Sequence, residues 1–180
     1  MAEGKYKKYV TKMVRPKDFR HDSKIGKATI GPPSYGKDLC NCEDAPIHIE
    51  HFQINKADCG FGLNTLMGPV VGNKMIYDLP HRHLSEELFM FTGSNMENPD
   101  DLGAEIEYWL GEGKEAEQFI ITEPTVVLVP AGTVHLPIYY RRINRPPVFM
   151  TVIGLAPIWY REDSKEYSPN FVGPSWFRRP

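Results

Sequence analysis

Proline and glycine occur along the whole chain, and this limits the length of any regular element. The 180 residues include 16 Pro and 15 Gly, which are scattered rather than gathered in one linker. One or the other interrupts almost every candidate helix, so helical periodicity is not sustained. The sequence therefore predicts many short elements separated by turns, with one plausible helical turn in the segment NPDDLGA (98–104).

Nine short runs have the composition or the alternation of β-strands. Alternation is clearest in AEIEYWL (104–110), where Ile106, Tyr108 and Leu110 share one face. Glu105 and Glu107 lie on the other face. Eight or nine short strands with turns between them predict an all-β sandwich or barrel. The nine runs are 47–54, 62–67, 74–79, 88–92, 105–110, 118–122, 125–129, 136–140 and 148–155.

The chain divides into an N-terminal arm (1–45), a β-barrel (46–160) and a C-terminal tail (161–180). The arm is basic at its start and then rich in turn residues. A chain of this length forms most simply one domain with a core of its own. Hydrophobic residues make up 41% and charged residues 24%, which is typical of a globular protein, and the net charge of -2 argues against a dedicated nucleic-acid binder.

Cysteine content and apolar stretches indicate the compartment. Three cysteines cannot all pair internally and are too few for a disulfide scaffold. The lysine-bearing start lacks the apolar segment of a secretory signal. No apolar stretch approaches the roughly 20 residues of a membrane helix. We therefore expect a cytoplasmic protein that does not bind membranes.

The segment YDLPHRHLSEELFMFTG (77–93) places ionisable groups beside an apolar run. Buried charges are costly unless something pairs them, so this segment requires a partner. His81 and His83 share one face if the segment is a strand. Glu87 has the same parity, but four further residues at ~3.3 Å each would carry it roughly 13 Å away. The chain must therefore turn at 84–86 and return Glu87 on the neighbouring strand.

A fourth possible ligand follows the strand and turn in VVLVPAGTVHLP (126–137), where His135 comes just after Pro-Ala-Gly. Three neutral imidazoles and one carboxylate form a good site for a divalent first-row metal ion. Such an ion would be the partner that the histidine segment requires.

These two segments resemble the two signature motifs of the cupin superfamily, with HRHLSEE matching the first and PAGTVH the second. The resemblance implies a small double-stranded β-helix, which is a jelly-roll barrel with a metal inside. It assigns His81, His83, Glu87 and His135 as metal ligands and Gly132 as the residue that lets the strand turn. Similar cupins commonly dimerise through N-terminal strands, so the resemblance also implies a homodimer with the arm at its interface.

The ligand set leads to a functional hypothesis. An ion held by three neutral histidines and one carboxylate keeps a charge of about +1 and attracts an anionic or enolisable ligand. We favour Fe(II), with Mn, Ni or Zn as alternatives. Strand parity predicts an apolar and aromatic pocket, which suits a small aromatic or enolisable substrate bearing one oxyanion. The predicted pocket residues are Met75, Tyr77, Phe89, Phe91, Ile106 and Tyr108.

The superfamily contains dioxygenases, isomerases, lyases and binding proteins, so fold alone does not select a reaction. The leading hypothesis is a metal-dependent enzyme in which oxygenase chemistry is favoured over lyase or isomerase chemistry. Tyr77, Glu86 and Tyr139 are the candidates for a general base. The alternative is a non-catalytic cupin that binds a small molecule or stores metal.

Other features favour structural interpretations over functional ones. His48, Glu50 and His51 could hold a second metal, but strand alternation puts His51 on the opposite face from the other two. Cys40 and Cys42 lack a partner pair, so they indicate a turn with incidental thiols. The basic, tyrosine-bearing start indicates a solvated arm or a strand exchanged with a second subunit rather than a nucleic-acid contact.

Overall fold

The computed structural model describes residues 19–21, 29–30, 34–35, 47–69, 77–155 and 161–180. Within these ranges the regular elements are short strands and one 3-10 turn, η2 (Gly113–Glu115). The segment 98–104 forms a simple turn, in which the Asp101 N–H donates to the Asn98 carbonyl at 3.1 Å, and not the expected helical turn. No helix in the described ranges has the length and apolar character needed to cross a membrane.

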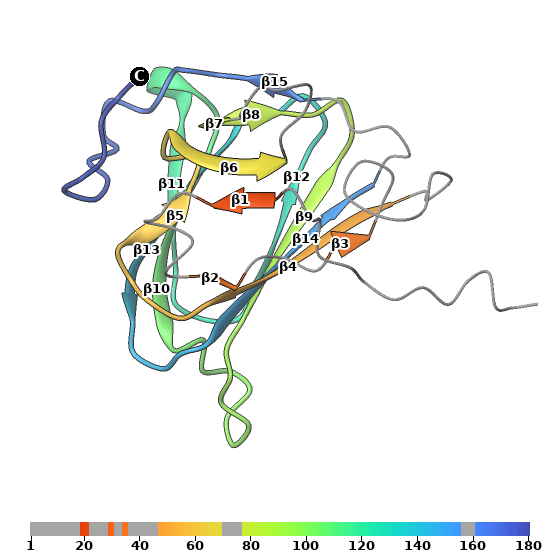
Figure 1. Ribbon diagram of the computed structural model, residues 1–180, viewed down its shortest axis with the longest axis vertical. Helices are drawn as coiled ribbons and strands as arrows, with labels where there is room; N and C mark the ends of the chain where they lie inside the picture. Colours follow the sequence, from red (N-terminus) through yellow and green to blue (C-terminus); the bar gives the residue numbers. More distant parts are fainter. Residues whose placement is uncertain (1–18, 22–28, 31–33, 36–46, 70–76, 156–160) are drawn as a thin grey trace, which may run out of the picture.

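The strands form two large antiparallel sheets and one small sheet (Figure 1). Sheet I has the order β11 (Glu117–Ile121), β10 (Ala104–Leu110), β13 (His135–Ile143), β8 (His81–Arg82) and β15 (Glu162–Asp163), and β5 (Cys59–Phe61) also pairs with β13. Sheet II has the order β12 (Thr125–Val129), β9 (Glu87–Thr92), β14 (Val148–Gly154), β4 (His48–Ile54) and β2 (Thr29–Ile30), and β3 (Ser34–Tyr35) also pairs with β4. The small sheet consists of β1 (Phe19–His21), β6 (Thr65–Pro69) and β7 (Tyr77–Asp78).

The strand pairing is that of a jelly roll. Going inward, β4 pairs with β14, β8 with β13, β9 with β12, and β10 with β11, all antiparallel. Such nested pairs describe one long two-stranded ribbon that has folded over on itself. Successive strands of the ribbon alternate between sheets I and II, except at the β10–β11 hairpin. The protein is therefore the all-β, double-stranded β-helix barrel that the sequence predicted.

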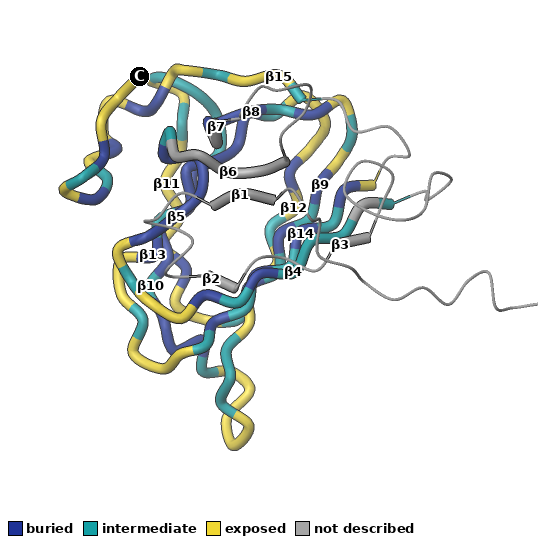
Figure 2. Tube along the Cα trace, viewed as in Figure 1, coloured by how far each residue is buried: buried dark blue, intermediate teal, exposed yellow. Residues whose placement is uncertain are grey.

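Alternating side chains fill the space between the two sheets. Strand β14 shows the pattern, because Val148, Met150 and Val152 are buried while Phe149 and Thr151 are partly exposed. Figure 2 shows buried positions along the strands of the sheets and exposed positions in the connecting loops. The inward-facing residues of both sheets join in one core cluster, the barrel core, which includes Phe52, Phe89, Phe91, Ile106, Tyr108, Ile138 and Tyr140.

The C-terminal tail covers the outer face of sheet I. Its aromatic residues pack on Leu63 and Trp109 in a second hydrophobic cluster, which we name the tail cluster. Short strand β15 of the tail also pairs with β8. The tail is thus part of the packed structure of the barrel. The buried residues of the tail cluster are Leu63, Trp109, Tyr167, Phe171 and Phe177.

Observed strand bounds differ from the predicted runs where turns were not recognised. The run 125–129 matches β12, but the run 62–67 crosses the end of β5 and the start of β6. Gly62 and Asn64 have φ angles of 69° and 55°, so the chain turns there. Most of the arm (1–45) lies outside the described residues, and its described strands β1, β2 and β3 pair with β6 and β4 of the same chain.

Candidate metal centre

His81 and His83 come from the segment in which ionisable groups adjoin an apolar run. His81 begins β8, where its backbone pairs with that of His135 in β13. His83 follows directly after β8, and the ring centroids of His81 and His83 are 4.8 Å apart. Both residues are buried, at 7% and 3% exposure. Alternation along a short strand therefore brings the two imidazoles to one side.

Glu87 reaches the same region from the facing sheet. We expected it on the strand next to that of the histidines, but β8 lies in sheet I and Glu87 begins β9 in sheet II. That detail was wrong because the ribbon of the jelly roll bends across the sandwich here instead of forming a hairpin. Glu87 is 3% exposed and shares its face with buried Phe89 and Phe91, whereas Glu86 is exposed.

Backbone contacts fix the His135 segment against the first one. Gly132 has a φ of 78°, in the left-handed region that favours glycine, and its N–H donates to the His83 carbonyl at 2.7 Å. His135 begins β13 and is fully buried. Leu136 has a φ of 74°, which is uncommon for a residue with a side chain.

The three imidazoles and the carboxylate converge. The ring centroid of His135 lies 4.5 Å from that of His81 and 5.4 Å from that of His83. Glu87 Oε2 lies 2.9 Å from His135 Nε2 and 3.8 Å from His83 Nε2. The 2.9 Å separation between Glu87 Oε2 and His135 Nε2 is short enough for a hydrogen bond, but the two atoms are not aligned for one. Within the described chain, neither atom has a hydrogen-bond partner.

His81 is held in the form that a metal ion needs. Its Nδ1 contacts the Leu79 carbonyl at 2.7 Å, and because a carbonyl only accepts, Nδ1 carries the proton. The Nε2 lone pair is then left for a metal. Burial lowers the pKa of His81 well below its ordinary value, and the charges of His135 and Arg161 lower it further. The imidazole therefore stays neutral, which is the state that binds metal ions.

This donor set fits a divalent first-row metal ion. Imidazole and carboxylate ligands suit Fe, Mn, Ni and Zn. One ligand atom from each of His81, His83 and His135 lies within 4.8 Å of the others. Two metal–ligand bonds of about 2.1 Å span at most about 4.2 Å, so the rings need to move inward only slightly. The three buried histidines can thus bind a metal ion, and the role of Glu87 as a fourth ligand stays a prediction.

The C-terminal tail supports the His81 strand, and our sequence interpretation missed this contact. The Ser164 N–H donates to the Pro80 carbonyl at 2.7 Å, and the Arg161 guanidinium donates to the Leu79 carbonyl at 3.4 Å. Both carbonyls lie just before His81. Strand β15 has only two residues, so alternation could not reveal it, and nothing in the sequence links it to β8.

Of the three predicted general bases, the two whose side chains the structure describes do not lie among the histidines. Tyr139 lies on the outer face of sheet I, where its hydroxyl donates to Asp58 Oδ1 at 3.1 Å and its ring packs against the tail cluster. Burial and the hydrogen bond to Asp58 raise the pKa of Tyr139 to about 12. Glu86 is exposed in the turn between β8 and β9. Tyr77 belongs to β7, and its side chain lies outside the described part of the structure.

Four of the six predicted pocket residues belong to the barrel core, namely Phe89, Phe91, Ile106 and Tyr108. The Phe89 ring lies beside the candidate metal centre, with its centroid 5.5 Å from that of His135 and 5.5 Å from that of Tyr108. Met75 lies outside the described residues. The role of these residues in lining a substrate pocket stays a prediction.

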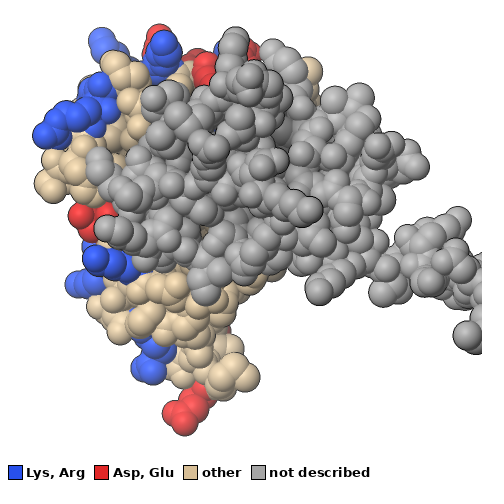
Figure 3. Space-filling view, in the orientation of Figure 1, with Lys and Arg blue, Asp and Glu red and all other residues tan. Residues whose placement is uncertain are grey.

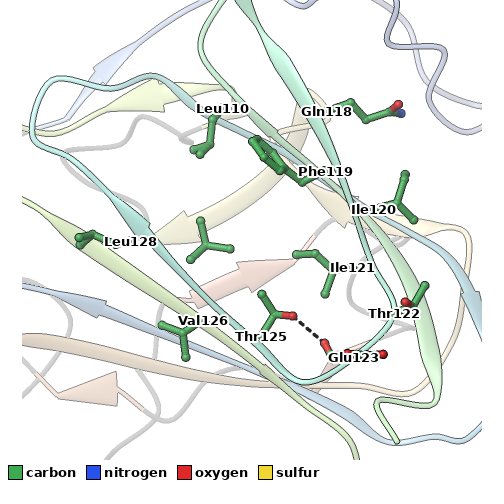
Figure 4. A pocket seen from close by; sticks show the side chains of 11 residues that line it. Leu110, Gln118, Phe119, Ile120, Ile121, Thr122, Glu123, Thr125, Val126 and Leu128 are labelled. Carbon is green, nitrogen blue, oxygen red and sulfur yellow. Dashed lines mark hydrogen bonds between the residues drawn. The ribbon is translucent and has the colours of Figure 1, made fainter. Parts of the chain in front are cut away.

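A separate groove runs between edge strands β11 and β12, with a volume of about 630 Å³ (Figure 4). It is open and largely apolar, and its lining includes the exposed side chains of Phe119, Ile120, Val126 and Leu128. None of its lining residues is a predicted pocket residue or a predicted metal ligand. The groove is therefore a different feature from the histidine site.

Several surface charges in the described ranges form pairs of opposite sign. Arg142 contacts Glu105 at 2.9 Å, and Arg82 contacts Glu162 at 2.9 Å. Figure 3 shows basic and acidic side chains interspersed on the described part of one face. The described part of this face therefore has no continuous surface of one sign.

Comparisons with known proteins add little to this description. No protein-family model matches the sequence, and no curated protein matches it. Vicilin from hazelnut (Corylus avellana) is 10% identical, with a TM-score of 0.47 over 84% of this chain and 36% of the vicilin chain. A protein from Planctomyces limnophilus is 10% identical, with a TM-score of 0.37 over 84% of this chain and 97% of that one. Both likenesses are weak, so the fold rests on the strand pairing above: a jelly roll whose three buried histidines can bind a metal ion.

Proposed function

We propose that this chain is a metal-dependent cupin that holds one divalent first-row ion through His81, His83, Glu87 and His135. The convergence of three buried imidazoles with one buried carboxylate carries the proposal. A buried carboxylate is costly unless a cation compensates it. The proposed cation removes this cost and satisfies the atoms that lack aligned hydrogen-bond partners.

Fe(II) is our preferred ion, and Mn, Ni or Zn would suit the same ligands. When bound, such an ion supplies Lewis-acid chemistry, and iron adds redox chemistry with O2. The protein contributes orientation, because the Leu79 carbonyl fixes the tautomer of His81. It also contributes a dry wall, since Phe89 lies against His135 and strengthens the attraction between the site and an anionic oxygen.

We infer that the substrate is a small aromatic or enolisable molecule bearing one oxyanion. The aromatic surroundings of His135 support this class over polyhydroxylated sugars. Oxygenase chemistry is our preferred hypothesis over lyase or isomerase chemistry. Of the predicted general bases, Glu86 is exposed and Tyr139 lies on the outer face of sheet I, while the Tyr77 side chain lies outside the described part of the structure. The competing function is a non-catalytic cupin that binds a small molecule or stores metal.

Metal analysis followed by oxygen uptake separates these possibilities. Protein purified without added metal is expected to carry one iron per chain and to consume O2 when small phenols or enols are added. A tightly held metal without turnover would favour the binding protein. Turnover without O2 consumption would favour the lyase or isomerase. Failure to hold any divalent metal would overturn the proposed function.

A further inference from the structure

Two tyrosine hydroxyls are buried in the barrel core without a hydrogen-bond partner in the described chain. Tyr108 and Tyr140 are both fully buried, and neither hydroxyl has a partner there. Leaving a buried polar group unsatisfied is costly, so folded proteins retain few of them. Each one calls for an explanation, such as a ligand or water that completes its hydrogen bonds.

The two hydroxyls differ in their surroundings. The Tyr108 ring contacts Phe89, whose ring also contacts His135, with both centroid distances at 5.5 Å. Tyr140 instead lies next to Phe61, at a centroid distance of 6.5 Å. Burial raises the pKa of both phenols well above the ordinary value. A smaller electrostatic contribution comes from Glu87 for Tyr108 and from Cys59 for Tyr140. The shared contacts of the Phe89 ring place Tyr108 one ring away from His135, whereas Tyr140 has Phe61 as its aromatic neighbour.

We propose that Tyr108 determines ligand specificity at this centre by donating a hydrogen bond from its hydroxyl to an anionic oxygen of the bound ligand. The inference rests on the proposed function, because the ligand is the one that the metal centre attracts. It goes beyond that function because the sequence predicts Tyr108 only as part of an apolar and aromatic pocket wall, whereas the inference gives its hydroxyl a polar role. A phenol that stays protonated can donate a proton in a hydrogen bond but cannot act as a base at neutral pH.

The position of the hydroxyl gives this role its physical basis. A donor fixed inside an apolar core needs no reorganisation when a ligand arrives, and the low local dielectric strengthens its hydrogen bond to an anion. The same hydroxyl is costly when no ligand is bound. Removing it should therefore stabilise the protein without ligand and weaken ligand binding, which is the trade-off expected of a functional group. A hydroxyl with only a structural role would not show this opposition.

The experiment compares Tyr108→Phe with Tyr140→Phe, which removes the matched hydroxyl away from the centre. The full chain is loaded with Co(II), and nitrocatechol is titrated while the absorbance of the metal complex is followed. Co(II) should bind stoichiometrically to all three proteins. Tyr108→Phe should bind nitrocatechol roughly tenfold to a hundredfold more weakly than wild type, while Tyr140→Phe should bind it equally well. Both variants should raise the melting temperature of the metal-free protein.

Each other outcome has a definite meaning. Normal Co(II) binding with equal nitrocatechol affinity in wild type and Tyr108→Phe would overturn the inference and leave the proposed metal site intact. Equal weakening by both variants would also overturn it, because the effect would then belong to the core and not to Tyr108. Absence of nitrocatechol binding to Co(II)-loaded wild type would refute the hydrogen bond to a catecholate oxygen. Absence of Co(II) binding to wild type would overturn the proposed function and this inference together.

Discussion

The two faces of sheet I differ in whether their buried polar groups have hydrogen-bond partners. On the outer face, the buried Glu107 carboxylate accepts a hydrogen bond from Trp109 Nε1 at 2.6 Å and also binds the Arg141 guanidinium. On the inner face, the hydroxyl of Tyr108, the next residue after Glu107, has no such partner in the described chain. His135 Nε2, also inside the barrel, lacks an aligned partner there as well. One strand, β10, therefore contributes to both a paired and an unpaired environment.

This difference separates structural groups from ligand-binding groups. A paired buried charge holds neighbouring elements together, and removing one member leaves the other uncompensated. Unpaired buried groups cost stability, and they persist where a ligand completes them. Changing the paired carboxylate of Glu107 on the outer face should consequently alter stability but not metal binding, whereas changing the histidines on the inner face should alter metal binding but not the fold.

The largest expected effect comes from the double variant His81→Ala/His83→Ala. Removing two of three imidazoles should abolish metal retention, because one histidine and one carboxylate cannot hold a first-row ion tightly. Circular dichroism should show the same β structure, since the barrel rests on its apolar strands. His51→Ala is the control, because His51 bonds Thr151 on sheet II and should not affect metal content. If the double variant still held one metal ion per chain, the metal site could not be the one on the inner face.

Glu87→Gln should weaken metal affinity by more than about a hundredfold. Removing a residue that only hydrogen-bonds to a metal ligand already costs about 10–100-fold, and removing a direct ligand should cost more. Glu86→Gln should leave the affinity unchanged, since Glu86 is exposed and Glu87 is 3% exposed. A competing chelator gives both affinities. The reverse result would mean that the turn before β9 is displaced by one residue, which would exchange the two faces of that strand.

Glu107→Ala tests the outer face. The change leaves Trp109 Nε1 without its acceptor and Arg141 without its main partner, so the free energy of unfolding should fall by about 2 kcal/mol. Arg141 is 40% exposed, and water should limit the loss. The control Glu105→Ala breaks a more exposed pair and should cost under about 1 kcal/mol. Urea unfolding gives both values. A fall in metal affinity for Glu107→Ala would show that the two faces are not independent.

The sequence predicts the inner face better than the outer one. Alternation in AEIEYWL assigns Ile106, Tyr108 and Leu110 to one face correctly, because the barrel core lies there. It also suggests an open polar face for Glu107, which is only 2% exposed. The neighbouring outer-face residue Trp109 packs against the tail, whose aromatic residues have irregular spacing. No local pattern indicates where an irregular segment docks.

In the candidate site, too, local sequence patterns predict some residues well and contacts between distant segments poorly. Two short motifs predict the three histidines, because each motif sets its spacing by local strand and turn geometry. Strand alternation places Tyr140 on the inner face of β13, so its neighbour Tyr139 points to the outer face, away from the histidines. Tyr139 was therefore a poor choice of general base. The role that we propose for the Tyr108 hydroxyl depends on Phe89 of the facing sheet, whose ring lies beside both Tyr108 and His135. Strand parity alone does not reveal which residues meet across a sandwich.

The smallest expected effect tests whether the outer tail influences the inner site through β8. Ser164→Pro removes the N–H that donates to the Pro80 carbonyl, directly before His81, because proline has no amide hydrogen. The His81 backbone should then be held less firmly, and metal affinity should fall by up to about tenfold, the lower end of the effect of groups that orient ligands. Ser164→Ala keeps this N–H and loses only the two hydroxyl hydrogen bonds, which join Ser164 to Glu112 Oε2 at 2.9 Å and to the Glu166 N–H at 3.1 Å, so its metal affinity should equal that of wild type. Chelator competition on both variants measures the difference. Equal affinities would show that the tail stabilises sheet I without positioning His81, and the two faces would then be energetically separate.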